Sequence, residues 1–269
     1  MQDNSRDSVL VTGAGSGIGR ATVCTLLEHK NANVFALDRD DELLADLERQ
    51  ANSPRLITCR FDLSSSDDIP EFVQTLVKEH GRINKLVNNA AVWSLQSIVD
   101  TDEECWDTTF AVNVKAPFLL IRELASVMSQ SGGGAIVNVV TRNAFRSSTK
   151  NATYDASKAS LLAFTRTAAG ELAGDQIRVN AVCPGMILTP PNAGLKDDKL
   201  FYDAYCRLIP MNRFGRPEEI ARVICFLLSD DSSFITGESI IVDGGQMACQ
   251  DNDRFREIPG LGHTHASPL

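Results

Sequence analysis

A short apolar run, a glycine-rich turn and a helical stretch follow one another near the start of the chain. The apolar run covers Val9 to Val11, residues 13–19 hold four glycines, and residues 20–30 have helical periodicity. Glycine lets the backbone approach a ligand closely, and a helix N-terminus presents free N–H groups to an anion. This order of elements predicts an α/β fold with a phosphate-binding turn. A tight turn without a ligand is the alternative.

The second expected strand, residues 33–37, ends in a carboxylate. Asp38 follows the glycine turn by about 20 residues, where an acidic side chain can bind a ribose 2′-hydroxyl and repel a 2′-phosphate. Asp38 therefore favours NAD over NADP as the cofactor. Arg39 comes next, and its positive charge can partly offset that preference.

Strands and helices alternate along the rest of the chain. Apolar strands are expected at residues 56–61, 83–87, 135–140, 177–183 and 239–242. Strands separated by helical segments are typical of a parallel sheet. A length of 269 residues suits one large α/β domain or two small ones.

A tyrosine and a lysine stand four residues apart after the strand at 135–140. Helical spacing puts Tyr154 and Lys158 on one face. An ammonium about 4 Å from a phenol, at an effective dielectric near 20, favours the phenolate by roughly three pKa units. Such a phenol is suited to general acid–base catalysis, and Thr141 offers a hydroxyl at the strand end. The same spacing also occurs by chance on many helices.

Six motifs in order resemble the short-chain dehydrogenase/reductase (SDR) family. They span about residues 8–247 and comprise the glycines at 13, 17 and 19, the segment Asn88–Ala91, Asn113, the Tyr154/Lys158 pair, Pro184–Gly185 and the segment 236–245. The resemblance implies a single Rossmann-type domain with a doubly wound, seven-stranded parallel sheet and helices on both faces. That domain would cover residues 1–249, with a substrate lid at about 186–212 and a polar tail at 250–269.

The resemblance also implies roles for individual residues. Tyr154 would be the acid/base, Lys158 would lower its pKa and bind the nicotinamide ribose, and Asn113 would anchor a water relay. Thr141 would hold the substrate where the family usually has Ser, and Ala91 replaces a usual Gly. The implied cofactor-binding residues are Gly13, Ser16, Gly17, Ile18, Gly19, Asp38, Asp62, Leu63, Asn89, Tyr154, Lys158, Pro184, Gly185, Ile187 and Thr189.

The sequence says least about the identity of the substrate. The loop after Thr141 is polar and basic; it holds Arg142, Asn143, Arg146, Lys150 and Asn151. If this loop faces the pocket, with Arg142 binding the substrate beside Thr141 and Tyr154, it favours a polyol, sugar or hydroxy acid. A solvated loop is the alternative. Aromatic side chains at Trp93, Phe201, Tyr202 and Tyr205 favour a cyclic or hydrophobic alcohol instead, or only anchor the lid.

Composition excludes several other classes. A net charge of −9 without a basic cluster argues against nucleic acid and anionic membranes, and no apolar run approaches the ~20 residues of a membrane span. Seven cysteines without a C-x-x-C motif indicate reduced thiols of a cytoplasmic protein. His263 and His265 have no evident third partner, so no metal site is expected.

The combined expectation is an NAD-dependent oxidoreductase that acts on a small-molecule secondary alcohol or ketone, most naturally in the oxidative direction. The wide apolar face of the helix that starts near Tyr154 predicts a homo-oligomer, a tetramer or a dimer. The alternative is a non-catalytic, dinucleotide-binding regulatory protein of the same fold. Only the replacement at Thr141 favours that alternative.

Overall fold

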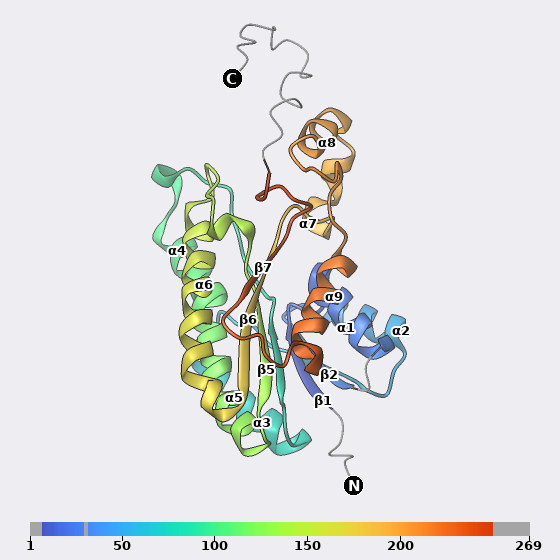
Figure 1. The fold of residues 1–269 in the computed structure, drawn as a ribbon, viewed down its shortest axis with the longest axis vertical. Coiled ribbons are helices and arrows are strands. Elements are labelled where there is room, and N and C mark those ends of the chain that lie inside the picture. Colours follow the sequence, from blue (N-terminus) through green and yellow to red (C-terminus); the bar gives the residue numbers. More distant parts are fainter. Residues whose placement is uncertain (1–6, 30–31, 250–269) are drawn as a thin grey trace, which may run out of the picture.

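A single parallel sheet forms the centre of the molecule (Figure 1). The structure, a computed structural model, describes residues 7–29 and 32–249. The strand order is β3-β2-β1-β4-β5-β6-β7, so the chain winds outward in both directions from β1 and β4. The strands are β1 Asp7–Thr12, β2 Ala32–Asp38, β3 Leu56–Arg60, β4 Lys85–Asn88, β5 Gly134–Val139, β6 Ile177–Pro184 and β7 Ser239–Val242. The predicted doubly wound, seven-stranded α/β fold is confirmed.

Helices cover both faces of the sheet, as Figure 1 shows. One face carries α1, α2 and α9, and the other carries α3, α5 and α6. The bounds are α1 Gly17–His29, α2 Asp41–Ala51, α3 Ile69–His80, α4 Glu103–Phe110, α5 Ala116–Gln130, α6 Ala152–Leu172, α7 Pro190–Ala193, α8 Lys199–Cys206 and α9 Pro217–Leu228. A strand buried on both faces needs apolar residues at successive positions, because side chains alternate between faces. In β1, Val9 and Val11 accordingly join one core and Leu10 the other.

A π-helical segment joins the helices α4 and α5. This segment, Ala111–Lys115, connects α4 to α5 without a break in the chain direction. Such π segments are rare and often occur at functional sites. Here it carries Asn113, which is completely buried.

The connection from β6 to α9 stands above the carboxyl ends of the strands. It contains α7, α8 and the 3₁₀ turn Gly194–Lys196, and Figure 1 shows α7 and α8 on this side of the sheet. Its own small core is formed by Cys206, Ile209 and Phe214. The segment is therefore folded on itself and not simply laid on the sheet.

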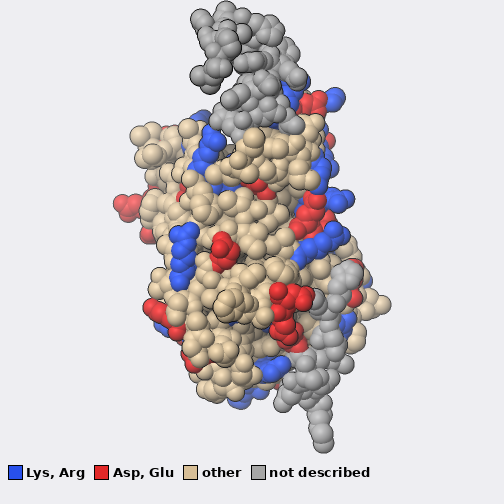
Figure 2. Space-filling view, viewed as in Figure 1, with Lys and Arg blue, Asp and Glu red and all other residues tan. Residues whose placement is uncertain are grey.

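The division at residue 249 stays a prediction, because the tail 250–269, with His263 and His265, lies outside the described residues. In the described ranges, no helix is long and apolar enough to cross a membrane. Figure 2 shows basic and acidic side chains interspersed over the viewed face, without a continuous basic surface.

Candidate active site

The glycine turn passes against the ends of two other segments. Gly13 has φ +63°, and a Cβ added there would lie 2.9 Å from the Cα of Ala90. Gly17, with φ +53°, opens α1, and its added Cβ would lie 3.1 Å from the Cγ2 of Thr189. A side chain at Gly13 would collide with the backbone of Ala90, and one at Gly17 would occupy the space at the start of α1. The backbone is thus bare where an anion would meet the N-terminus of α1.

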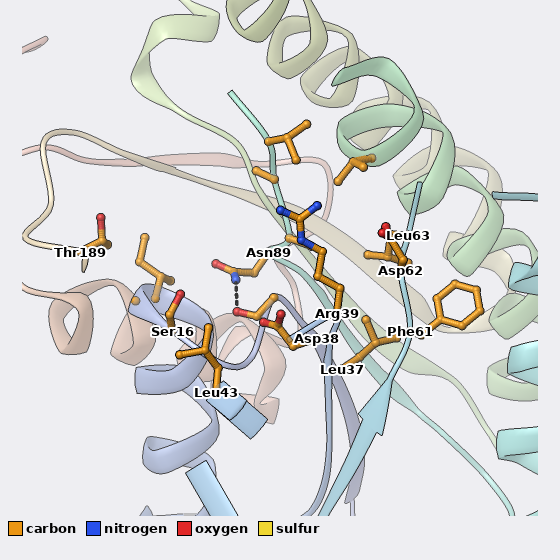
Figure 3. Close-up of a pocket in the computed structure, with 17 residues that line it drawn as sticks. Ser16, Leu37, Asp38, Arg39, Leu43, Phe61, Asp62, Leu63, Asn89 and Thr189 are labelled. Carbon is orange, nitrogen blue, oxygen red and sulfur yellow. Dashed lines mark hydrogen bonds between the residues drawn. The ribbon is translucent and has the colours of Figure 1, made fainter. Parts of the chain in front are cut away.

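Two polar side chains lock this turn to β4. The amide nitrogen of Asn89 donates to the carbonyls of Thr12 (2.9 Å) and Gly13 (3.1 Å), and Figure 3 shows the second bond. In return, the hydroxyl of Thr12 accepts from the backbone N–H groups of Asn89 and Ala90, each at 3.0 Å. Thr12 was missed in the sequence because it looks like an ordinary strand residue.

A cleft of about 310 Å³ opens along this turn. The predicted residues on its walls are Gly13, Ser16, Gly17, Ile18, Asp38, Asp62, Leu63, Asn89 and Thr189. Gly19 is not on the wall, because it packs behind the turn: an added Cβ would lie 2.0 Å from the Gly13 carbonyl oxygen. Arg39, Leu43 and Phe61 also line the cleft. An elongated cleft with a bare helix N-terminus at one end fits a dinucleotide.

Asp38 is oriented by backbone donors at the edge of this cleft. Its carboxylate accepts from the N–H of Gly15 at 2.9 Å and from the N–H of Asp40 at 3.2 Å. Arg39 follows it and extends among the cleft residues (Figure 3). Asp62, farther along the wall, accepts from the N–H of Ser64 at 2.9 Å. That bond, with the hydroxyl of Ser64 and the charge of Arg39, lowers the pKa of Asp62 against the effect of its partial burial.

Tyr154, Lys158 and Thr141 meet in a second cavity of about 530 Å³ that adjoins the cleft. Both spaces share Ile18, Asn89, Ala91 and Thr189 as walls. Predicted residues Pro184, Gly185 and Ile187 line the second cavity, as does Arg142. The structure therefore brings the sequence-predicted catalytic pair and the nicotinamide-side residues to one place.

The pKa of Tyr154 differs from the sequence-based expectation. Burial raises it to about 12, a hydrogen bond with the Thr141 hydroxyl lowers it, and the charge of Asp155 raises it. The expected depression by Lys158 is absent, because the lysine Nζ donates to the Val139 carbonyl at 2.8 Å and lies 5.9 Å from the centre of the phenol ring. Burial also lowers the pKa of Lys158 to about 8, so the ammonium form still predominates at neutral pH.

The predicted catalytic residue Asn113 lines neither space; it links the segment at Val92 to α6. Its Oδ1 accepts from the N–H of Val92 and its Nδ2 donates to the Val92 carbonyl, both at 2.9 Å. The same Nδ2 also donates to the Ser157 hydroxyl on α6 at 3.0 Å. Both amide donors are therefore used by protein groups. Any water relay at this position would depend on the Asn113 backbone or the remaining lone pair of Oδ1.

Comparison with known proteins agrees with this geometry. A family model described as enoyl-(acyl carrier protein) reductase matches residues 13–247. The 3-oxoacyl-[acyl-carrier-protein] reductase FabG of Thermotoga maritima is 41% identical over 238 residues, 88% of this chain and 96% of that protein. The NAD-dependent glycerol dehydrogenase of Listeria innocua is 37% identical over 243 residues, 90% and 94% of the two chains.

A solved structure from Brucella melitensis, described as short-chain dehydrogenase/reductase SDR:glucose/ribitol dehydrogenase, superposes with a TM-score of 0.82. It is 33% identical and covers 89% of this chain and 96% of its own. The chain belongs to the short-chain dehydrogenase/reductase family. The two relatives named above are a reductase and an alcohol dehydrogenase, which supports an oxidoreductase of this family.

One feature of this SDR site was missed in the sequence: Asp155 holds the loop between Thr141 and Tyr154. Its buried carboxylate accepts from the Nδ2 atoms of Asn143 (3.0 Å) and Asn151 (2.8 Å) and from the N–H of Ser148 (2.7 Å). Asn143 in turn donates its N–H to the Thr141 hydroxyl at 3.2 Å. The sequence did hold a signal for this role, because a charged residue directly after Tyr154 on a buried helix needs hydrogen-bond partners.

The polar loop of the SDR site is divided between cavity and surface. Arg142, Asn143 and Asn151 line the cavity, whereas Arg146 and Lys150 are exposed and are not among the lining residues. The cavity is also lined by the aromatic side chains of Trp93, Phe201 and Tyr205. Tyr202 instead packs in the small core beside Phe214, with ring centres 4.7 Å apart. The predicted basic loop therefore contributes one arginine to the cavity.

Proposed function

We propose that this SDR protein is an NAD-dependent dehydrogenase of a secondary alcohol, with Tyr154 as its acid/base. The observation that carries the proposal is the meeting of Tyr154, Lys158 and Thr141 in a cavity that adjoins a cleft edged by Asp38. The cleft beside this cavity would hold the nicotinamide cofactor, which would supply hydride transfer to or from the carbinol carbon of the substrate.

The protein groups handle the proton and the position of the substrate. The Thr141 hydroxyl and the Tyr154 phenol line the same cavity, and that hydroxyl lowers the pKa of the phenol, so one alcohol oxygen could bond to both groups. During oxidation Tyr154 takes the hydroxyl proton, and during reduction it gives that proton to the carbonyl oxygen. The buried ammonium of Lys158 lines the same cavity, where it would bind the nicotinamide ribose.

The pKa of Tyr154 near 12 gives this step a pH dependence. Oxidation needs the phenolate, whose population grows as pH approaches that pKa from below. We therefore expect the oxidation rate to rise from about pH 7 to about pH 10, whereas reduction, which needs the neutral phenol, stays level over the same range. Stopped-flow rates in both directions measure this contrast.

The preference for NAD rests on Asp38. A ribose 2′-hydroxyl can donate to this carboxylate, whereas a 2′-phosphate would repel it, and Arg39 is the neighbouring charge that opposes the preference. Variants Asp38→Ala and Arg39→Ala separate the two effects. We expect Asp38→Ala to reduce the NAD-over-NADP ratio about 10-fold or more and Arg39→Ala to increase it.

The test of the function is reduction of NAD or NADP, followed spectroscopically with polyols, sugars, hydroxy acids and cyclic alcohols. Turnover with NAD that disappears in Tyr154→Phe supports the proposal. Turnover with NADP alone contradicts the cofactor assignment. NAD binding without turnover across the panel instead favours the regulatory, non-catalytic alternative, and Thr141→Ser would then be the next variant to examine.

We further propose a homo-oligomer formed through α6. Its outward face has the small, exposed residues Ala159, Ala163 and Gly170, and exposed Trp106 and Phe118 flank it on α4 and α5. Small residues let two helices approach closely, and adjacent aromatic rings add apolar area. Light scattering should report a tetramer or a dimer, and Ala163→Arg should dissociate it while Ala193→Arg on the lid does not.

A cytoplasmic location is part of the same proposal. All seven cysteines are free thiols in the structure, which fits a reducing compartment. Cell fractionation followed by detection of the native chain measures this directly, and recovery with the membrane or secreted fraction would contradict it.

A further inference from the structure

The second cavity is positively charged although the chain is acidic. Its described lining includes Arg142 and Lys158 but no aspartate or glutamate, in a protein of net charge −9. Lys158 is already bound to the Val139 carbonyl and belongs to the reaction centre. Arg142 is thus the charge that this cavity presents to the part of the substrate that does not react.

The contacts of Arg142 leave most of its guanidinium unused by the protein. One nitrogen, Nη2, donates to the phenol oxygen of Tyr205 on α8 at 2.9 Å. Within residues 7–29 and 32–249, no carboxylate forms an ion pair with Arg142. A guanidinium has five N–H donors in a planar fork that matches a carboxylate. The neutral Tyr205 oxygen therefore orients Arg142 without neutralising it.

We propose that the substrate of this enzyme carries a carboxylate, which Arg142 and Tyr205 bind together. The proposal rests on the proposed function and selects hydroxy acids and their oxo acids from the broader class of secondary alcohols. The Tyr205 oxygen accepts from Arg142, so its own O–H is free to donate to the same carboxylate. Thr141 and Arg142 are consecutive, so the reacting hydroxyl and the carboxylate are held from one short turn.

The surroundings of Arg142 fit a small acid with an apolar part. Asp155, the acidic group behind the loop, is not on the cavity wall, and its carboxylate is taken up by Asn143, Asn151 and the N–H of Ser148. Those donors stand between its charge and the cavity. Trp93, Leu95 and Phe201 line the remaining wall, where a hydrocarbon segment would be buried.

The experiment compares carboxylates with their neutral amides. Initial rates with NAD are measured for 2-hydroxybutyrate and 3-hydroxybutyrate, each beside its primary amide, in the native protein and in Arg142→Gln. We expect the native enzyme to prefer the acid by about 10- to 100-fold in kcat/KM, and Arg142→Gln to lose this preference while retaining activity on the amide. Arg142→Lys, which keeps the charge but not the fork, should fall between them.

Two further variants sharpen the result. Arg146→Gln removes an exposed charge from the same loop and should leave the preference unchanged, which excludes a general change in net charge. Tyr205→Phe removes only the phenol and should reduce the preference by about 3- to 10-fold. Circular dichroism checks that each variant is folded. If Arg142→Gln does not fold, Arg142→Lys still tests the proposal.

Calorimetric titration of Tyr154→Phe with the same acids and amides separates this inference from the proposed function. Acid binding by Tyr154→Phe that is lost in the double variant Tyr154→Phe/Arg142→Gln supports the carboxylate site. If the native protein also shows no turnover with any alcohol, the same result contradicts the dehydrogenase. Turnover of neutral alcohols with no acid preference, or a preference that survives in Arg142→Gln, overturns the carboxylate site and leaves the dehydrogenase intact. Absence of acid binding in the titration also overturns it.

Discussion

The cofactor cleft and the substrate cavity share four wall residues but are built in different ways. The cleft is formed by strand ends and a backbone turn, which Thr12 and Asn89 fasten to β4. The cavity is formed by a loop and a lid that side chains hold in place, through Asp155 and through the bond from Arg142 to Tyr205. A change in the first region should therefore act through backbone geometry, and a change in the second through individual side-chain bonds.

The largest effect is expected for Tyr154→Phe, which should stop proton transfer without altering the cofactor cleft. Tyr154→Phe removes the proton carrier but leaves the ring, so kcat should fall by about 10³-fold while NAD affinity stays within about 3-fold. Steady-state kinetics and a fluorescence titration with NADH measure the two quantities. Loss of cofactor affinity in this variant would show that the cofactor cleft and the substrate cavity do not act independently.

A pair of glycine substitutions tests the backbone side of the comparison. An alanine at Gly19 would place a Cβ 2.0 Å from the Gly13 carbonyl oxygen, whereas nothing lies within 4 Å of a Cβ added at Gly194 in the lid. Overpacking of this kind costs about 1–3 kcal/mol, so Gly19→Ala should weaken NAD binding by about 10- to 100-fold. Gly194→Ala should leave binding unchanged. Equal effects of the two substitutions would contradict the backbone-based description of the cleft.

The sequence predicted the backbone-built region better than the side-chain-built one. The glycine turn, Asp38 and Asn89 were identified because glycine spacing and strand-end polar residues report local backbone demands. The doubly wound, seven-stranded sheet followed from the family resemblance, and the placement of the Thr141 hydroxyl near Tyr154 was expected from its position at the end of a strand. Gly19, which the resemblance implies to be a cofactor-binding residue, does not line the cleft, and a fingerprint does not separate a glycine that meets a ligand from one that lets the turn pack.

The substrate cavity was less predictable because its form depends on contacts between distant residues. The sequence indicated a polar, basic loop but could not tell that Arg142 enters the cavity and Arg146 does not. It also predicted a depressed pKa for Tyr154 from its distance to Lys158. That expectation omitted the burial of both groups and the Val139 carbonyl, which takes the lysine as a hydrogen-bond donor.

Asp155 tests the side-chain part of the comparison. In Asp155→Asn, one acceptor oxygen becomes an NH₂ group that faces existing donors, and a buried mismatch of this kind costs about 1–3 kcal/mol. We expect kcat/KM to fall by about 10-fold, a lower melting temperature and unchanged NAD affinity. Asp197→Asn, at an exposed lid position, is the control. A change in NAD affinity instead of turnover would place Asp155 with the cofactor cleft.

Glu219 gives a smaller, pH-dependent test at the end of the lid. Its carboxylate accepts from the Arg213 guanidinium at 2.6 and 2.8 Å and from the N–H of Arg216 at 2.8 Å, and these bonds lower its pKa to about 2. An unfolded glutamate titrates near 4.3. The depressed pKa means that this stabilisation is complete above about pH 4.5 and is lost as pH falls towards 2.

Because the Glu219 pair is partly exposed, its contribution should be on the order of 1 kcal/mol. Urea unfolding of the native protein and of Glu219→Gln should therefore differ at pH 6 and converge near pH 2.5, while the NAD affinity of the two proteins at pH 7 should be equal. A stability difference that is independent of pH would show that the effect comes from packing rather than from the ionised carboxylate.

The smallest effect is expected for Thr141→Ser, at a residue that departs from the family pattern. Its hydroxyl already accepts from the N–H of Asn143 at 3.2 Å and bonds to Tyr154, so both tasks depend on the oxygen and neither on the methyl group. Thr141→Ser should change kcat/KM by less than about 3-fold, whereas Thr141→Val, which keeps the shape and removes the oxygen, should reduce it by about 100-fold. A large increase of kcat/KM in Thr141→Ser would mean that the methyl group of Thr141 restricts the cavity. Thr141 would then influence which substrate fits, as the other side chains of the loop and lid do.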